Sequence, residues 1–352
     1  MKRIALILPC NIERAPYIYY YIDIFRENNI PFEVIYWNKD NKKIQKYNFN
    51  TNCYSPKKSI IPSILVQLSF YFYTIKLLKK KQYTHVITFT IIPIIILHRF
   101  LEKNYKSNYI YDIRDYSNIL KYSKNIFSSS LQKARQVVIS SEGFKSWLPK
   151  RDYLISHNVR KSLLIDHKDQ MVSLPNDNIR ILTIGQIRDY NTNFALIKTT
   201  ANINNISNLL AGYGKVYNLL KKKCNKYHYN NINFLGEYAK DKENEIVLNT
   251  SFINAITPID LQSKFLITNR LYLSCLYRRP IIVSSNTYQA EIVNKFQLGI
   301  TIQNFDELIT QINSYMKNFS EKTFDENCKK FISYIMKDIT TFEHEITNSI
   351  FN

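Results

Sequence analysis

Short apolar runs alternate with helix-length segments along almost the whole chain, and this alternation restricts the fold more than any other feature. It predicts parallel sheets with helices on both faces, because parallel neighbouring strands need a long crossover that is usually a helix. The expected strands of the first half are RIALILP, FEVIYW, HVITF, NYIYD, QVVIS and YLIS, with helices over 17–28 and near Phe144. Those of the second half are IRILTIG, SNLLAGYG, INFLG, FINAIT and PIIVSS, with helices near 193–203, 214–224 and 240–249 and another beginning near Tyr288.

A polar stretch over 166–178, which contains DHKDQ and LPNDN, separates the two series and is the expected linker. The chain has 352 residues, of which 45% are hydrophobic, so it is long enough for two domains with separate cores. We therefore expect an α/β protein with two doubly wound, Rossmann-like domains facing a cleft, over 1–165 and 175–334. A last helix over 335–352 is expected to pack back on the first domain.

The cysteines and the N-terminus indicate a cytoplasmic protein. The five cysteines show no paired spacing, which argues against a zinc site and a disulfide framework. Met1-Lys2-Arg3 runs directly into IALILP, which is shorter than the apolar region of a secretory signal and is expected to form the first buried strand.

The formal net charge of +20 indicates attraction to an anion, either a nucleic acid, an acidic lipid surface or a diphosphate. A second explanation of the positive charge needs no anionic partner. The chain is rich in Asn, Ile, Lys and Tyr, as expected from an AT-rich genome, and such a genome encodes many lysines. Its basic residues are widely spread, and no helix-turn-helix, zinc-finger or RNP signature is present. We expect no nucleic-acid partner, and nucleic-acid binding remains the less favoured alternative.

The segment 62–81 is mostly apolar and ends in three lysines, Lys79, Lys80 and Lys81. A buried core helix is the first interpretation. The second is an interfacial helix whose lysines contact anionic headgroups, and the third, less favoured because of Pro62 and Gln67, is a spanning helix. The apolar run 86–97 is expected to form a buried strand, a turn and a helix.

Four of the six glycines follow expected strands of the second half: Gly185, Gly212, Gly214 and Gly236. In an open α/β sheet this edge is where ligands bind, although each glycine alone is also explained by a tight turn. The strand PIIV ends in Ser, Ser, Asn and Thr just before a helix, an arrangement that presents N–H groups to a phosphate.

The order of several segments resembles GT-B glycosyltransferases of the type that assembles bacterial capsule, exopolysaccharide or lipopolysaccharide, similar to glycosyltransferase family 4. In the second half these segments are ILTIGQIRDYNTNFALI, LLAGYGK, NINFLGEY and TNRLYLSCLYRRPIIVSSNTYQAEIVNKFQLGI. In the first half they are YIDIFRENNIPFEVIYWNKDN, YIYDIRDYS, VVISSEGFKSWLP and SHNV. The resemblance covers nearly the whole chain.

The resemblance implies a hexosyltransferase-like enzyme that moves a sugar from a nucleotide-diphosphate sugar to a growing, lipid-linked surface glycan. It favours a retaining reaction and a donor held mostly by the second domain. Arg188 lies where the family places a basic diphosphate contact, and Arg270 replaces the lysine of its Asn-Lys-x-Tyr-Glu pattern. The implied donor residues are Gly185, Arg188, Gly212, Arg270, Tyr272, Ser285, Thr287 and Glu291. No cofactor is expected, and no metal either, because no convincing Asp-x-Asp loop or metal-ligand spacing is present.

The acceptor side is expected in the first domain, at Asp112, Arg114 and Asp115 of DIRDY and in the loop that carries Asn11 and Arg14. If the reaction inverts, one of the two carboxylates is the candidate general base, whereas in a retaining reaction the leaving phosphate oxygen can take the proton. A structural ion pair explains these residues equally well.

His157, in ISHNV ahead of the linker, is a further candidate on the acceptor side. The competing interpretation is a histidine that only makes structural hydrogen bonds.

One departure from the family pattern concerns two glutamates eight residues apart, whose positions are taken here by Phe265 and Leu273. Neither side chain accepts a hydrogen bond. A catalytically inactive GT-B protein that binds a sugar nucleotide or acts as a scaffold is therefore the main alternative to an active enzyme. A sugar-nucleotide 2-epimerase shares the same two-domain architecture and is a further one.

Overall fold

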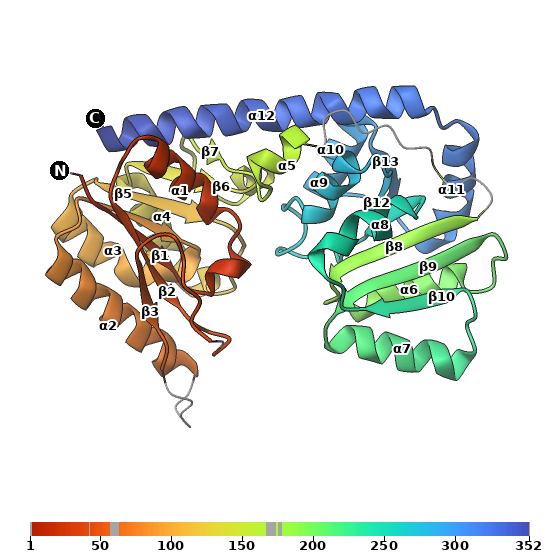
Figure 1. The fold of residues 1–352 in the computed structure, drawn as a ribbon, viewed down its shortest axis with the longest axis horizontal. Coiled ribbons are helices and arrows are strands. Elements are labelled where there is room, and N and C mark those ends of the chain that lie inside the picture. Colours follow the sequence, from red (N-terminus) through yellow and green to blue (C-terminus); the bar gives the residue numbers. More distant parts are fainter. Residues whose placement is uncertain (1, 42, 57–62, 167–173, 175–177, 352) are drawn as a thin grey trace. The chain divides into compact units, whose positions relative to one another are not determined.

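The computed structural model describes residues 2–41, 43–56, 63–166, 174 and 178–351 (Figure 1). The chain divides into an N-terminal unit, Met1–Arg160 with Lys337–Asn352, and a C-terminal unit, Lys161–Met336. Most of the expected linker lies outside the described residues. Each unit is built on its own parallel sheet.

The N-terminal unit contains a seven-stranded sheet in the order β3-β2-β1-β4-β5-β6-β7, and every registered strand pair is parallel. Its strands are β1 (Ile4–Leu8), β2 (Phe32–Trp37), β3 (Thr51–Tyr54), β4 (His85–Phe89), β5 (Tyr109–Ile113), β6 (Gln136–Ile139) and β7 (Leu154–Ile155). Its helices include α1 (Ile18–Glu27), α2 (Ser63–Lys81), α3 (Ile91–Tyr105) and α4 (Leu120–Lys133), with short 3₁₀ turns η1 (Ile12–Arg14) and η2 (Glu142–Ser146). The central strands β1, β4 and β5 are buried along their whole length, which explains why their sequences are mostly apolar.

The C-terminal unit contains a six-stranded sheet in the order β10-β9-β8-β11-β12-β13, again parallel throughout (Figure 1). Its strands are β8 (Ile179–Gln186), β9 (Ile206–Tyr213), β10 (Ile232–Gly236), β11 (Phe252–Ala255), β12 (Ile281–Ser284) and β13 (Gly299–Ile302). Its helices are α5 (Lys161–Asp166), α6 (Tyr190–Thr200), α7 (Lys215–Tyr227), α8 (Glu243–Leu248), α9 (Asn269–Leu276), α10 (Tyr288–Phe296) and α11 (Leu308–Lys317), with 3₁₀ turns η3 (Lys240–Lys242) and η4 (Phe305–Glu307). Ile181, Phe252 and Ile282 belong to one buried cluster of this unit.

The last helix, α12 (Glu321–Phe351), contributes its residues before Lys337 to the C-terminal unit and the rest to the N-terminal unit. It begins well before the expected position 335, because apolar residues recur at helical spacing from residue 324 onward without a breaking glycine or proline. The buried stripe consists of Phe324, Cys328, Phe331, Ile335, Ile339, Phe342, Ile346 and Ile350. In the N-terminal unit the ring of Phe342 packs edge-to-face on Tyr21, with ring centroids 5.2 Å apart.

The predicted apolar runs form strands as expected, and two further strands were not predicted from the sequence. Strand β3 reads TNCY and is only half-buried, and β13 reads GITI and is short. Both lie at a sheet edge, where fewer apolar residues are needed, so their sequences carry a weak strand signal. Helix α6 begins three residues before the predicted 193, because the Asp189 carboxylate accepts a hydrogen bond from the Thr192 N–H (2.6 Å) and caps the helix.

Helix α2 covers the described part of the segment 62–81, and it has two different faces. Phe70, Tyr71, Thr74 and Leu78 are buried, so the core-helix interpretation holds for this face. The opposite face exposes Leu65, Leu68 and Phe72 and continues into Lys76, Lys79 and Lys80. Lys81 is not part of that surface, because its Nζ pairs with Glu33 at 2.6 Å. No helix in the described ranges combines the length and the apolar character needed to cross a bilayer.

Candidate functional site

Strands β8 and β11 of the C-terminal unit are parallel neighbours and end side by side. From β8 the chain continues to β9 and β10 on one side, whereas β11, β12 and β13 follow on the other. This reversal is a topological switch point, and in open α/β sheets ligands bind outside the strand ends at such a point.

Two glycines shape this edge. Gly185 in β8 is paired in register with Gly212 in β9, and Gly185 has a φ of +88°. A Cβ on Gly212 would lie 1.8 Å from the carbonyl oxygen of Gly185, so only glycine fits there. Gly214 (φ +128°) and Gly236 (φ +83°) follow at the ends of β9 and β10. The backbone therefore turns sharply at three neighbouring strand ends.

Arg270 lies across the switch point. Its Nε donates to the carbonyl oxygen of Ile184 (2.9 Å) and its Nη1 to that of Asn254 (3.0 Å), near the ends of β8 and β11. Burial lowers the pKa of Arg270 to about 10, with Tyr238 acting in the opposite direction and the charge of Arg188 lowering it further. The guanidinium is still protonated at neutral pH.

Arg188 supplies a second positive charge at the same edge. Its Nε and Nη2 both donate to the Gln186 side-chain oxygen, at 2.9 and 2.7 Å, and the residue is otherwise exposed. Neither Arg188 nor Arg270 forms an ion pair with a carboxylate in the described part of the chain. Two uncompensated guanidinium groups near one strand edge favour an anionic ligand.

The expected phosphate cradle after β12 is partly used by the protein itself. Thr287 caps α10 by accepting from the Ala290 N–H (3.1 Å), while its own hydroxyl donates to the Ser284 carbonyl (2.8 Å). The N–H of Ser285 donates to Ile302 O (2.8 Å) and that of Tyr288 to Lys264 O (2.8 Å). Only part of the α10 N-terminus therefore remains for a ligand.

Two side chains of this segment are still unengaged. The Ser285 hydroxyl oxygen is buried and has no hydrogen-bond partner among the described residues. Glu291, in the first turn of α10, is exposed.

Tyr272, by contrast, belongs to the core. It is 3% exposed and its ring stacks on Phe331 of α12, with centroids 6.3 Å apart. Phe265 and Leu273, at the positions of the two family glutamates, are half-buried.

Two tyrosines near the arginines were not identified from the sequence. The pKa of Tyr238 is raised, first by burial and then by the charge of Glu243, with a further contribution from Tyr213. The charge of Arg270 acts in the opposite direction. The Tyr238 hydroxyl donates to Glu243 at 3.2 Å, and Tyr213 is 49% exposed. Each tyrosine follows a strand-end glycine within two positions, a signal that could have revealed both.

In the N-terminal unit, Asp112 and Arg114 form a fully buried pair at the end of β5. Arg114 also donates to the Ser156 carbonyl (2.7 Å) and lies 4.1 Å over the ring of Tyr17, and the Tyr21 hydroxyl donates to Asp112 (2.7 Å). Burial raises the pKa of Asp112 although Arg114 and Tyr21 favour its charged form. Burial of Arg114 disfavours its charged form, but the carboxylate of Asp112 outweighs this effect, so the pKa of Arg114 is raised. This arrangement agrees with the structural ion-pair interpretation.

Among the three candidates Asp112, Arg114 and Asp115, only Asp115 is exposed. Asn11 is 4% exposed; its amide donates to Asn38 (2.8 Å) and its oxygen accepts from the Asp40 N–H (3.0 Å), so it holds two loops together. Arg14 pairs with Asp40 at 2.7 Å but remains mostly exposed.

His157 lies 2.9 Å from the Asp338 carboxylate of α12 and is 1% exposed. Its surroundings therefore fit a structural hydrogen bond. Within the residues that the structure describes, no group of three His, Cys, Asp or Glu side chains is placed to hold a metal ion.

No family model matches the chain, and no curated protein matches it. Solved structures do match over nearly its whole length. Sucrose-phosphate synthase from Thermosynechococcus elongatus is 12% identical with a TM-score of 0.75, covering 100% of this chain and 99% of that one. Anabaena HepE in complex with UDP is 12% identical (TM-score 0.71, 99% of each chain), and the apo lipopolysaccharide outer core galactosyltransferase WaaB is 13% identical (0.69, 99% of each). The predicted fold class, GT-B with two Rossmann-like domains, is thereby confirmed.

Proposed function

We propose that this protein is a glycosyltransferase that transfers a sugar from a nucleotide-diphosphate sugar. The observation that carries the proposal is the position of Arg270 and Arg188 at the switch point of the C-terminal sheet, without carboxylate partners among the described residues. The fold supports it, since structural neighbours with this fold include HepE solved with UDP and with UDP-glucose.

The chemistry fits the two charges. When the bond between the sugar and the diphosphate breaks, a further negative charge develops on the leaving phosphate oxygen. Positive groups held in place before the reaction stabilise that charge without having to reorganise. Arg270 is held by two backbone carbonyls, whereas Arg188 is anchored only to Gln186 and can adjust to the ligand. These groups would meet the diphosphate charge without a metal ion.

The finer assignment is a hexosyl transfer to a growing, lipid-linked surface glycan, with retention of configuration. Burial of Asp112 in an ion pair favours a retaining reaction over one that uses this carboxylate as a base, because a retaining reaction can pass the acceptor proton to the leaving phosphate. Asp115, Arg14 and Glu291 are the exposed polar candidates for acceptor and sugar hydroxyls.

We further propose that the enzyme is cytoplasmic and works at the inner face of the plasma membrane. The exposed face of α2 combines Leu65, Leu68 and Phe72 with Lys76, Lys79 and Lys80. Apolar side chains next to lysines are typical of helices that lie on anionic lipid surfaces.

The proposal is tested by calorimetric titration with UDP-, GDP- and CMP-sugars, followed by a product assay with a lipid-diphosphate saccharide and the donor that binds. Binding of one donor and transfer of its sugar, unchanged by EDTA, is the expected result. Failure of every donor to bind would refute the function itself.

A binder without activity is the second candidate, favoured by Phe265 and Leu273 at the positions of the family glutamates and by the burial of Asp112. Donor binding without transfer to any lipid-linked acceptor would support it against the transferase.

A further inference from the structure

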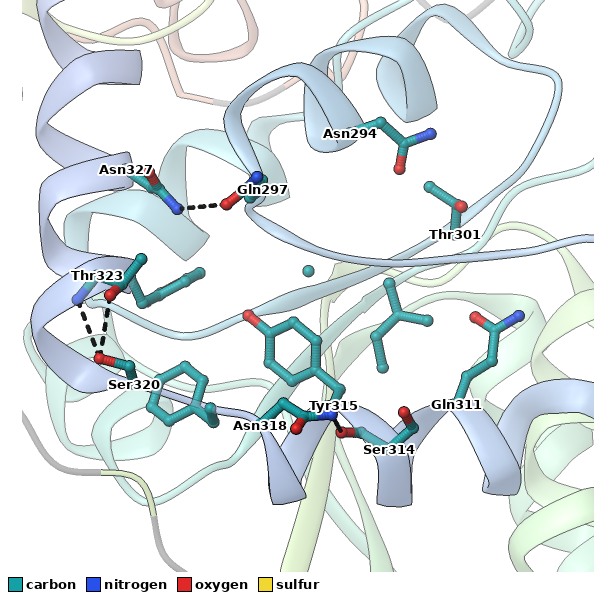
Figure 2. A pocket seen from close by; sticks show the side chains of 14 residues that line it. Asn294, Gln297, Thr301, Gln311, Ser314, Tyr315, Asn318, Ser320, Thr323 and Asn327 are labelled. Atoms are coloured by element: carbon teal, nitrogen blue, oxygen red, sulfur yellow. Dashed lines mark hydrogen bonds between the residues drawn. The ribbon is translucent and has the colours of Figure 1, made fainter.

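A large open pocket lies in the C-terminal unit, away from the arginines. Its cavity volume is about 560 Å³, within the range of roughly 300 to 1,000 Å³ typical of small-ligand sites. It is lined by the C-terminal end of α10, the first residues of β13, and parts of α11 and α12 (Figure 2). The arginines belong to the opposite edge, where β8 and β11 end and α9 begins.

The lining of this pocket is polar but uncharged. None of the described residues that line it carries a charge. Side-chain amides surround it, namely Asn294, Gln297, Gln311, Asn318 and Asn327. Each amide can both donate and accept hydrogen bonds, as a sugar hydroxyl also does.

Three polar groups of the lining are not used by the protein. The side chains of Asn294 and Thr301 and the hydroxyl of Tyr315 make no hydrogen bond to any residue that the structure describes. In Figure 2 the Tyr315 hydroxyl points toward the α12 side of the pocket, where Thr323 and Asn327 lie. Unsatisfied donors and acceptors in a concave site define what a ligand must offer.

Aromatic rings form an apolar part of the wall. Tyr315 and Phe319 lie with ring centroids 5.7 Å apart, and Phe319 and Phe324 5.5 Å apart. A ligand for this pocket therefore has hydroxyl groups on its edges, an apolar face and no net charge. We propose that the pocket is a binding site for an uncharged saccharide, separate from the site of sugar transfer. The inference does not depend on the proposed activity.

The test is binding of uncharged disaccharides, namely maltose, cellobiose, lactose and chitobiose, to the full chain with and without excess UDP. Saturation-transfer NMR identifies the binder, and calorimetry gives its Kd. Tyr315→Phe removes one hydroxyl and keeps the ring, and Asn294→Ala removes an exposed amide. Each is expected to weaken binding about five- to tenfold, the loss of one hydrogen bond.

Asn313→Ala is the matched control, because Asn313 is exposed on α11 but does not line the pocket; its Kd should not change. Thermal unfolding of all three variants verifies that they fold. Three results would overturn the inference: no disaccharide binds, Tyr315→Phe and Asn294→Ala both bind as well as the parent, or glucuronate or uridine binds more tightly than every disaccharide. Because donor binding is measured in a separate titration, failure here is distinguishable from failure of donor binding.

Discussion

The Nε of Arg270 lies 2.9 Å from the carbonyl oxygen of Ile184, so a residue in the first turn of α9 donates a hydrogen bond to the end of β8. This hydrogen bond, together with that to Asn254, orients a cation at the reversal point of the sheet. The remaining nitrogen, Nη2, makes no hydrogen bond to a described residue and is available to a ligand.

Arg188→Ala is expected to weaken binding of the donor nucleotide by about 1.5 to 3 kcal/mol, the value of a charged hydrogen bond, and to leave thermal stability unchanged. The reason is that Arg188 is exposed and anchored only to Gln186. Calorimetric titration with the donor that binds measures the effect. Lys198→Ala, an exposed lysine on α6, removes the same charge elsewhere and should have no effect. Equal affinity of both variants and the parent would place the diphosphate elsewhere.

Arg270→Ala should act differently, because it removes the proposed diphosphate contact and also leaves the carbonyls of Ile184 and Asn254 without the donor that Arg270 provides. Donor affinity is expected to fall by about 1.5 to 3 kcal/mol and stability by about 1 to 3 kcal/mol. Donor titration together with urea unfolding separates the two effects. A variant that is destabilised but binds normally would leave Arg270 a purely structural role.

Gly212→Ala is expected to destabilise the C-terminal unit by about 1 to 3 kcal/mol, because its Cβ would meet the carbonyl oxygen of Gly185 at 1.8 Å. Gly185→Ala meets no atom within 4 Å, so its cost is the strain of a positive φ alone, about 1 to 2 kcal/mol. Urea unfolding of the two variants measures the difference. Full stability of Gly212→Ala would contradict the register of β8 and β9.

Asp112→Ala should destabilise the N-terminal unit by about 3 to 5 kcal/mol, because it leaves the buried charge of Arg114 unpaired. Asp115→Ala, at an exposed position, is expected to unfold like the parent protein. Urea denaturation compares them. A stable Asp112→Ala protein that had lost only its activity would instead favour a catalytic role for this carboxylate.

Glu33 makes the stability of the N-terminal unit pH-dependent. Its carboxylate accepts hydrogen bonds from Lys81 (2.6 Å), Asn52 (2.6 Å) and Tyr83 (3.0 Å) and pairs with Arg3. Burial opposes the charge, but these partners outweigh it and lower the pKa from 4.5 to about 2. The contribution to stability is therefore complete above pH 4.5 and is lost as the pH falls toward 2.

Glu33→Gln is expected to cost about 2 to 3 kcal/mol at pH 7 and to flatten the decline of stability between pH 4.5 and 2. Unfolding curves recorded at several pH values check this. A parent and variant with parallel pH profiles would show that Glu33 is not the group responsible.

The proposed lipid-facing role of α2 is tested by replacing Lys76, Lys79 and Lys80 with glutamine. Binding to phosphatidylserine-containing vesicles should weaken by about 1 kcal/mol per lysine, as measured by sedimentation. A control with the same change of charge replaces three exposed lysines of α7, namely Lys221, Lys222 and Lys226. Equal losses in both variants would mean that only the net charge matters.

The sequence by itself determined the order of strands and helices and the parallel character of both sheets. These follow from apolar periodicity, which is a local property of the chain. The predicted strands were correct, but the half-buried edge strand β3, the short β13 and the helices α4 and α11 were not predicted. The turns at the strand-end glycines were also predictable from the sequence, because glycine is favoured where the backbone turns with positive φ.

Only the tertiary structure decided what each polar side chain faces. Asp112 and Asp115 are three residues apart, yet one is buried on Arg114 and the other is exposed. Tyr272 faces the core while Arg270, two residues earlier, reaches the sheet edge.

The uncharged pocket likewise exists only because α10, β13, α11 and α12 meet in space. Exposure and hydrogen bonding depend on partners that are distant in sequence, and a single sequence records the residue but not its partner.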